Sequence, residues 1–163
     1  MIPPTPINKY YNLEIFDCGD AELNKWLKEK AILNEGEASR TYLVASNEKV
    51  VIAYYSLAYG SIRREIAISK VKRNMPDPIP AMLVGRLAVD TKWHGTGLGR
   101  GMLRDTVIRT LDASKVAGLR ALFVHAISPE AKAFYSKCGF SPFPINSMTL
   151  MITVKEVRSA LLG

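Results

Sequence analysis

Apolar and polar positions along the chain change spacing several times, and each change predicts a new element. In the first regular pattern, Leu23, Trp26, Leu27 and Ala31 recur at intervals of one helical turn or less. This spacing places them on one face of a helix. Asp20 precedes the pattern, where a carboxylate accepts hydrogen bonds from the first free amides of a helix. The sequence therefore predicts a helix that begins after Asp20.

Two apolar runs then indicate a β-hairpin. They cover residues 41–45 and 50–59, and the residues between them are polar, which is typical of a hairpin connection. The segment 61–71 is ambiguous. Residues 74–80 contain three prolines, which remove amide donors and restrict their neighbours, so we expect a loop. The opening segment 1–12 also contains three prolines and is expected to be extended.

The second half of the chain alternates strand and helix patterns. Branched apolar residues over 82–89 predict a strand that passes through a glycine-rich turn, 95–101, into a long helix. We expect Gly118 to end this helix, because glycine readily adopts the left-handed conformation found there. Residues 119–127 predict the next strand. In the long helix before this strand, the inner face is expected to hold Leu103, Val107 and Leu111.

A shorter helix is expected next. Ser128 is a favourable helix cap, and Pro129 suits the first helical position because the amide it lacks has no partner there. Gly139 is expected to close the helix. Residues 148–154 predict a final strand before a short basic tail. In the shorter helix between Ser128 and Gly139, the buried face is expected to hold Ala131, Phe134, Tyr135 and Cys138.

The composition is that of a globular protein with one core. The chain has 163 residues, of which 48% are hydrophobic and 23% are charged, and a chain of this size readily buries one core. We therefore expect a single domain, 1–163. The longest apolar runs are too short to cross a bilayer, and no targeting segment opens the chain, so we expect a cytoplasmic protein without membrane contact.

The net charge of +7 predicts attraction to polyanions. It does not distinguish nucleic acid from an acidic partner or from the phosphates of a cofactor. Two distant histidines and two separated cysteines form no recognisable metal site, so we expect no metal. Nothing supports a disulfide between Cys18 and Cys138.

The strongest local signal is a glycine-rich segment between a predicted strand and a predicted helix. Glycines let a phosphate approach the backbone, and the amides of a first helical turn point outward with the positive end of the helix dipole behind them. The segment therefore predicts a pyrophosphate cradle, the alternative being a tight turn that merely requires glycine. A Walker loop would end in Gly-Lys-Ser or Gly-Lys-Thr, which is absent, and no convincing acidic residue supports a dinucleotide fold. The segment consists of His94, Gly95, Thr96, Gly97, Leu98, Gly99, Arg100 and Gly101.

The sequence here resembles the GNAT acetyltransferase family. The acetyl-CoA loop of that family reads Gln or Arg, two residues, Gly, one residue, and Gly or Ala. Gly97 and Gly99 match this loop, whereas His94 departs from its first position. A second segment is similar to the family's Asn-x-x-Ala-x-x-Phe-Tyr-x-x-x-Gly-Phe. Its matching positions are Ser128, Ala131, Phe134, Tyr135, Gly139 and Phe140.

The resemblance implies an α/β (α+β) fold in which helices flank a mixed, twisted sheet that is splayed near Leu87–Val89 to admit acetyl-CoA. It implies that Tyr135 is the general acid that protonates the departing coenzyme A thiolate, with a core aromatic as the less favoured alternative. Direct attack is expected, because no cysteine stands in the motif to carry the acetyl group. Helix capping alone would explain Ser128, and a core position would explain Phe134. Contacts to acetyl-CoA are implied for Leu87, Ala88, Val89, residues 94–101, Ser128 and Phe134.

Within the family, the whole chain resembles the acetyltransferase toxins of bacterial toxin–antitoxin pairs. The resemblance implies acetylation of the α-amino group of aminoacyl-tRNA, which blocks translation. It also implies a homodimer and neutralisation by a ribbon-helix-helix antitoxin. The resemblance rests on segments 16–19, 23–24, 40–42, 73–80 and 85–90.

An α-amino acceptor fits the weakness of the candidates for a general base. Such an amine titrates near about 7.7, whereas lysine titrates near about 10.4 and needs more help. Glu130 suits a helix start and Asp90 suits a loop cap. An acetyltransferase for a protein or small-molecule amine, and a non-catalytic acetyl-CoA-binding module, remain alternatives. Two basic runs could follow tRNA phosphates, with a solvated face as the alternative for each: Arg63, Arg64, Lys70, Lys72 and Arg73, and then Lys25, Lys28 and Lys30.

Overall fold

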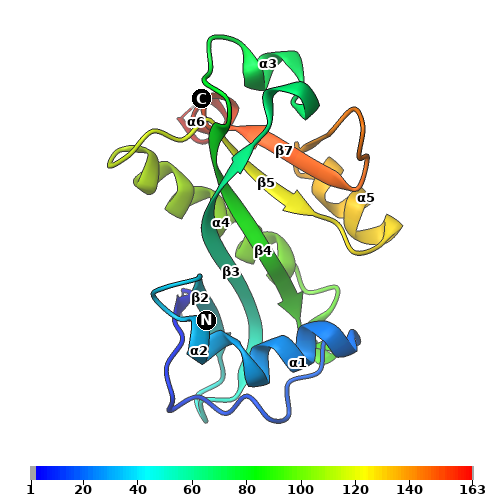
Figure 1. The fold of residues 1–163 in the computed structure, drawn as a ribbon. Helices are drawn as coiled ribbons and strands as arrows, with labels where there is room; N and C mark the ends of the chain where they lie inside the picture. The colour runs from blue at the N-terminus through cyan, green and yellow to red at the C-terminus, as the bar shows by residue number, and fades with distance from the viewer. Residues whose placement is uncertain (1–2, 163) are drawn as a thin grey trace. The chain divides into compact units, whose positions relative to one another are not determined.

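The computed structural model describes residues 3–162, and the strands within them form a mixed seven-stranded sheet (Figure 1). The strand order is β1-β2-β3-β4-β5-β7-β6. β4 and β5 pair in parallel, whereas the β2–β3 and β5–β7 pairs are antiparallel. The predicted α/β class is confirmed. The strands are β1 (Thr5–Pro6), β2 (Arg40–Ala45), β3 (Val51–Ile62), β4 (Ile79–Val89), β5 (Ala121–His125), β6 (Ser141–Pro142) and β7 (Thr149–Thr153). The helices are α1 (Ala21–Glu29), α2 (Ala31–Asn34), α3 (Ser69–Lys72), α4 (Leu98–Ser114), α5 (Pro129–Lys137) and α6 (Val154–Leu162), with 3-10 turns η1 (Arg64–Ile66) and η2 (Thr91–Trp93).

The chain forms two compact units. Unit 1 consists of Met1–Ala58 and Gly85–Thr106, and unit 2 consists of Tyr59–Val84 and Val107–Gly163. Strands β3 and β4 and helix α4 each begin in one unit and end in the other. The expectation of a single domain over 1–163 stays a prediction.

Unit 1 contains the predicted hairpin. β2 and β3 are antiparallel, with Thr41 opposite Ser56. Lys49 returns the chain between them with a φ of 64°, and its amide donates to the Ser46 carbonyl at 2.9 Å. β3 extends to Ile62, beyond the predicted strand, and so takes in the start of the segment that was ambiguous in sequence.

The predicted first helix is divided into α1 and α2. The Asp20 carboxylate accepts a hydrogen bond from Leu23 N at 3.0 Å, as predicted for a helix cap. Lys30 stands between the two helices, yet Leu27 before it and Ala31 after it are both fully buried. The apolar stripe therefore continues across the break. The core around it includes Phe16, Leu43, Val51, Tyr54 and Ala88.

Replacing the Asp20 cap tests the start of α1. Asp20→Ala is expected to lower the free energy of unfolding by about 1 kcal/mol, because the amide of Leu23 loses its acceptor. Urea denaturation measures this change. Glu22→Ala, at an exposed position of the same turn, is the control. Equal stability of the Asp20→Ala variant and the wild type would show that the cap contributes nothing.

β4 begins inside the segment that was predicted to be a loop. Ile79 and Pro80 are its first two residues, so the loop expected over 74–80 ends earlier. Ile79 is fully buried, and its burial favours the extended conformation. Pro80 is tolerated because it lies at the very start of the strand, and its carbonyl still accepts a hydrogen bond from Arg120 N at 2.9 Å.

Unit 2 builds its part of the sheet from β5, β6 and β7 and from the parts of β3 and β4 that lie in it. Ala81–Val84 pair in parallel with Ala121–Val124. Ala121 lies opposite Thr153 of β7 in the antiparallel register. This register brings the start of β5 next to the end of β7, where Val154 N donates to the Arg120 carbonyl at 3.0 Å.

Several predicted boundaries are wrong. α4 ends at Ser114 rather than at Gly118, whose φ is not left-handed. The predicted basic tail is instead helix α6. Thr153 and Glu156 cap that helix reciprocally, since Glu156 N donates to Thr153 Oγ1 at 3.0 Å and Thr153 Oγ1 donates to Glu156 Oε1 at 3.0 Å. On α4, only Leu103 of the predicted inner face is fully buried, together with Met102, Thr106 and Thr110.

Membrane passage was not expected from the sequence. Within residues 3–162, every helix is too short or too polar to span a bilayer.

Candidate active site

The glycine loop lies in unit 1 between β4 and α4, as predicted. Gly95 and Gly97 have φ angles of 76° and 86°, a left-handed conformation that residues with a side chain rarely adopt. A Cβ atom added at Gly95, Gly97 or Gly101 would meet no atom within 4 Å. The backbone path therefore favours glycine at 95 and 97, and the space beside the loop is open to a ligand.

The first turn of α4 presents backbone amides that have no acceptor within residues 3–162. They belong to Leu98, Gly99 and Arg100, whereas Gly101 N donates to the Gly97 carbonyl at 3.1 Å. Free amides at a helix N-terminus, together with the positive end of the helix dipole, favour an anion. In the segment 94–101, where the sequence predicts a pyrophosphate cradle, these three amides are therefore the ones free to bind an anion.

Two side chains stabilise the loop. His94 Nε2 lies 2.7 Å from the Val89 carbonyl oxygen, and Thr96 Oγ1 donates to the Trp93 carbonyl at 2.6 Å. His94, the residue that departs from the family's loop pattern, thus connects the loop to the end of β4. The hydrogen bonds of both side chains hold the turn itself.

The end of β4 has peptide groups that β5 does not pair. The parallel register with β5 ends at Val84. Asp90 N donates to a β3 carbonyl at 2.8 Å, and peptide groups alternate in direction along a strand. The backbone N–H and C=O groups of Leu87 and Val89 therefore point away from β3. A ligand that lies along this edge of β4 would face them. Ala88, which the sequence also placed in the site, directs its peptide group toward β3.

Tyr135 lies on α5 in unit 2 and is 6% exposed. Its ring centroid is 5.3 Å from that of Phe134 and 5.8 Å from that of Phe140. Burial raises the pKa of Tyr135 to about 12, with a further contribution from Cys138. Within residues 3–162 the hydroxyl has no hydrogen-bond partner. The phenol therefore keeps its proton and has it available to donate.

Helix α5 has the ends that the sequence predicted. Ser128 Oγ accepts a hydrogen bond from Ala131 N at 3.1 Å, and Gly139 follows the helix with a φ of 98°. Phe134 is half-buried beside Tyr135. The predicted site residues thus fall into two groups, with Ser128, Phe134 and Tyr135 in unit 2 and the glycine loop and the end of β4 in unit 1.

Within residues 3–162, neither cysteine forms a disulfide or belongs to a cluster that could hold a metal ion. Cys18 and Cys138 are free and half-buried, although the sequence placed Cys138 on a buried stripe. Burial raises the pKa of the Cys18 thiol, which keeps it protonated and poorly nucleophilic. Across residues 3–162, no three His, Cys, Asp or Glu side chains lie close enough to hold a metal ion.

The sequence did not reveal two polar arrangements in unit 1. The buried Tyr55 hydroxyl donates to Asp105 on α4, which joins this helix to β3. The Arg86 guanidinium carbon lies 4.2 Å from the ring centroid of Trp26 on α1, a cation–π distance. Arg86 is a charged residue inside the predicted strand 82–89, a signal that could have suggested a polar contact but not its partner.

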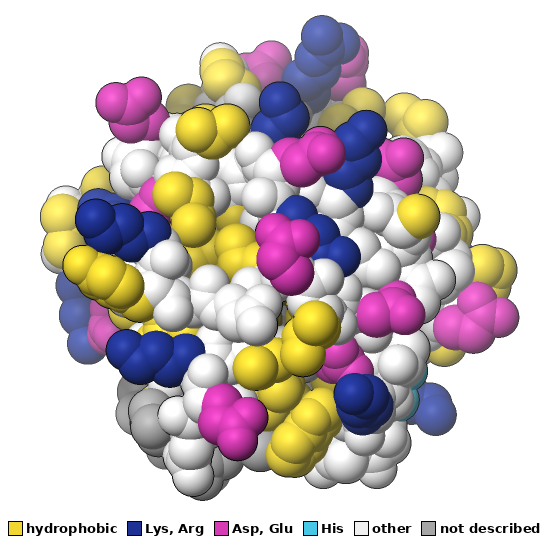
Figure 2. Space-filling model, turned by 90° about the horizontal axis from the view of Figure 1, so that it is seen from below, with side chains coloured by type: hydrophobic (Ala, Val, Ile, Leu, Met, Phe, Trp, Pro, Cys, Tyr) yellow, Lys and Arg dark blue, Asp and Glu magenta, His cyan; other side chains and the backbone are white. Residues whose placement is uncertain are grey.

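The two basic runs differ in their surroundings. In the first, Arg64 Nη1 donates to the Lys72 carbonyl at 2.6 Å, and Arg63 forms an ion pair with Glu65 at 3.5 Å. The second run lies on α1 and at Lys30 between α1 and α2, in unit 1 (Figure 1). In the view from below Figure 1, Lys and Arg side chains are interspersed with Asp, Glu and hydrophobic side chains (Figure 2), which is typical of a solvated face.

Comparison with known protein families identifies the family of this fold, which carries the glycine loop, the free amides and the buried tyrosine. Residues 38–142, more than half of the chain, match the acetyltransferase (GNAT) domain. The chain therefore belongs to the GNAT acetyltransferase family, and the resemblance deduced from its two motifs is confirmed.

Individual relatives match nearly the whole chain. A tRNA-acetylating toxin of Mycobacterium tuberculosis is 38% identical over 98% of this chain and 96% of its own length. The structure of AtaT complexed with acetyl-methionyl-tRNAfMet superposes with a TM-score of 0.87 at 28% identity, covering 94% of each chain. A tyrosine-to-phenylalanine mutant of the AtaT toxin, bound to the C-terminus of the antitoxin AtaR and to acetyl-CoA, superposes with a TM-score of 0.84 at 25% identity and covers 98% of each chain.

Proposed function

We propose that this protein is a toxin that transfers the acetyl group of acetyl-CoA to the α-amino group of aminoacyl-tRNA and so blocks translation. The proposal rests above all on one observation. A chain similar to a tRNA-acetylating toxin over almost its whole length has a buried tyrosine that keeps its proton at the position where the GNAT motif has its general acid.

The residues of unit 1 suit the binding of acetyl-CoA. The free amides of Leu98, Gly99 and Arg100 are placed to bind a pyrophosphate, because they combine hydrogen-bond donors with the positive helix end. The outward backbone groups of Leu87 and the outward amide of Val89 can hydrogen-bond an amide-containing arm, while the Val89 carbonyl already contacts His94. When bound, acetyl-CoA supplies an acetyl group activated as a thioester. The remaining expected contacts are His94, Gly95, Thr96, Gly97, Gly101, Ser128 and Phe134.

Tyr135 performs the proton transfer in this proposal. The neutral α-amine attacks the thioester carbonyl, the carbon–nitrogen bond forms, and the carbon–sulfur bond breaks. The Tyr135 hydroxyl gives its proton to the departing sulfur, solvent accepts the proton that the amine loses, and the Tyr135 phenolate takes a proton back from solvent. A buried phenol suits this task, because desolvation opposes formation of the phenolate before the transfer.

The pH dependence follows from the direction of the Tyr135 pKa. Its active form is the protonated phenol, and a pKa of about 12 keeps that form intact through neutral and moderately alkaline pH. The acceptor amine must instead lose a proton, with a pKa near about 7.7. Initial-rate kcat/KM for aminoacyl-tRNA should therefore rise through neutral pH to a plateau without falling again below about pH 10. A falling limb near pH 8 to 9 that Tyr135→Phe removes would contradict the assignment.

We propose the assembly and the location from the similarity of this chain to the acetyltransferase toxins. We expect one catalytic domain per chain, a homodimer, a cytoplasmic location, and neutralisation by an antitoxin of the ribbon-helix-helix class. The complexes of AtaT with tRNA and with an antitoxin support this proposal. Co-expression with the neighbouring gene product and size measurement of the purified complex test it. A protein that stays monomeric and binds no such partner would contradict this part.

Transfer of labelled acetyl tests the reaction itself. Purified protein is incubated with labelled acetyl-CoA and a mixed pool of aminoacyl-tRNA, with deacylated tRNA as the control. We expect label on the charged pool alone. Label on added protein or polyamine, with none on charged tRNA, would keep the acetyltransferase activity and overturn the acceptor.

A further inference from the structure

A concave site lies in unit 2, built from segments that are distant in sequence. It is a cavity of about 440 Å³, and its charged lining residues are Lys70, Arg73, Arg120, Lys155 and Glu156. Lys70 lies on α3 and Arg73 at its C-terminal end. Arg120 precedes β5, and Lys155 and Glu156 lie in the first turn of α6. We call this the α3–α6 pocket. It contains no residue of the glycine loop and no residue of α5.

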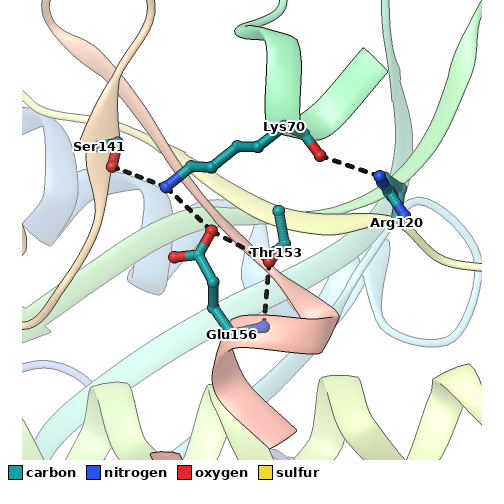
Figure 3. Close-up of polar contacts among 5 residues, drawn as sticks. All are labelled: Lys70, Arg120, Ser141, Thr153 and Glu156. Carbon is teal, nitrogen blue, oxygen red and sulfur yellow. Dashed lines mark hydrogen bonds and ion pairs between the residues drawn. The ribbon is translucent and has the colours of Figure 1, made fainter. Parts of the chain in front are cut away.

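Arg120 is held rigidly in the α3–α6 pocket. Its Nε donates to the Val71 carbonyl at 3.0 Å, and its Nη2 donates to the Lys70 carbonyl at 2.9 Å and to the Arg73 carbonyl at 3.5 Å. Figure 3 shows the contact with Lys70. Within residues 3–162, Nη1 has no acceptor. One end of the guanidinium is therefore fixed by backbone carbonyls while the other end keeps donors for a ligand.

The carboxylate in the pocket is already neutralised. Lys70 Nζ lies 2.9 Å from Glu156 Oε1, and the same oxygen accepts a hydrogen bond from Thr153 Oγ1 at 3.0 Å (Figure 3). Lys70 Nζ also lies 3.3 Å from Ser141 Oγ. Glu156 is thus occupied by the Lys70 ion pair and by the cap of α6. It does not cancel the charge of the other cations.

Three positive charges therefore remain around the cavity. Arg73 and Lys155 are exposed, and neither has an ion-pair or hydrogen-bond partner for its side chain among the described residues. Together with Arg120 they surround a space that can hold a nucleotide-sized group. Cations with unused donors favour an anion that has several acceptor oxygens, and a phosphodiester has this chemistry.

We propose that the α3–α6 pocket binds backbone phosphates of the RNA acceptor. This inference rests on the proposed function, because RNA is the substrate that the proposed reaction must hold. An acidic polypeptide offers the same charge, but RNA is favoured because the proposed reaction must hold RNA, of which one phosphate can engage the Arg120 guanidinium while Arg73 and Lys155 neutralise the neighbouring phosphates. Each such contact releases counterions, so its loss lowers both the affinity and the salt dependence of binding.

The test removes the unpaired cations and measures RNA binding. Arg73→Gln and Lys155→Gln, alone and combined, are compared with wild type for binding of fluorescent deacylated tRNA over a series of salt concentrations. The double variant should bind about tenfold or more weakly, and the slope of log affinity against log salt should fall by about 1 for each residue replaced. Lys115→Gln is the matched control, since Lys115 is exposed in the same unit but pairs with Asp112 at 3.5 Å.

Activity with charged tRNA provides a second readout. For the double variant, KM for aminoacyl-tRNA should rise while KM for acetyl-CoA stays at the wild-type value. Thermal unfolding at the wild-type temperature confirms that each variant is folded. The Lys115→Gln control should retain wild-type tRNA affinity.

Three results would overturn the inference. The first is wild-type tRNA affinity and salt slope in the double variant, and the second is an equal loss in Lys115→Gln. The third is unchanged tRNA binding with lost binding of polyglutamate, which would assign the pocket to an acidic polypeptide. Binding to deacylated tRNA is measured without acetylation, so failure of this inference can be told apart from failure of the proposed reaction.

Discussion

Replacing Tyr135 with phenylalanine should lower kcat for acetyl transfer by about 100-fold or more, because general acid catalysis contributes about 10²–10⁴ in rate. The substitution removes only the hydroxyl. The ring keeps its contacts with Phe134 and Phe140, at centroid distances of 5.3 and 5.8 Å. The measurement is single-turnover acetylation of aminoacyl-tRNA with enzyme in excess.

Binding measurements separate this effect from a general loss of structure. Because the hydroxyl has no partner within residues 3–162, its removal should leave the fold and the affinity for acetyl-CoA unchanged. Phe134→Leu is a useful comparison, since it alters the neighbouring ring and leaves the Tyr135 hydroxyl in place. Wild-type kcat in Tyr135→Phe would show that another group, or water, protonates the thiolate.

Gly97→Asp should weaken acetyl-CoA binding by about tenfold or more. The new carboxylate would lie beside the free amides of Leu98, Gly99 and Arg100, where it would accept their hydrogen bonds and repel a pyrophosphate. A Cβ atom at Gly97 would meet no atom within 4 Å, so the side chain has room to leave the backbone. At 4 Å, two unit charges repel by about 1 kcal/mol in water and about 4 kcal/mol near a protein surface, and about 1.4 kcal/mol is a factor of ten in affinity.

Gly97→Asn is the matched control for charge. Asn and Asp have nearly the same shape, and both tolerate the φ of 86° at this position better than most residues. Calorimetry with acetyl-CoA should give a smaller loss for Gly97→Asn. The Asp variant should be at least as thermally stable as the Asn variant, because a negative charge favours a helix N-terminus. Equal affinities in the two variants would place the pyrophosphate elsewhere.

Features that depend on neighbouring residues were predictable from the sequence. The ends of α5 follow from Ser128 and Gly139, and the Asp20 cap and the β2–β3 hairpin were predicted correctly. In each case a short segment contains its own signal, such as a cap, a turn glycine or an apolar spacing. The glycine loop belongs to the same group, since its glycines and the helix that follows are contiguous.

Features that depend on tertiary contacts were missed. Gly118 was expected to end α4, but a glycine ends a helix only where the chain must turn left-handed, and the chain does not do so there. Ile79 entered a strand despite its proline neighbours because burial favoured it. The α3–α6 pocket could not be predicted, because Arg120 reaches α6 only through the register that sets Ala121 opposite Thr153.

The most direct test of the central claim is the chemical identity of the amino acid released from tRNA after the reaction. Charged tRNA is incubated with the protein and acetyl-CoA, the ester is cleaved under mild conditions, and the released amino acid is analysed by mass spectrometry. We predict the N-acetyl amino acid with the wild type and the free amino acid with Tyr135→Phe at the same early time point. Unmodified amino acid in the wild-type reaction, with acetyl-CoA bound and the protein folded, would contradict the claim that this acetyltransferase acts on aminoacyl-tRNA.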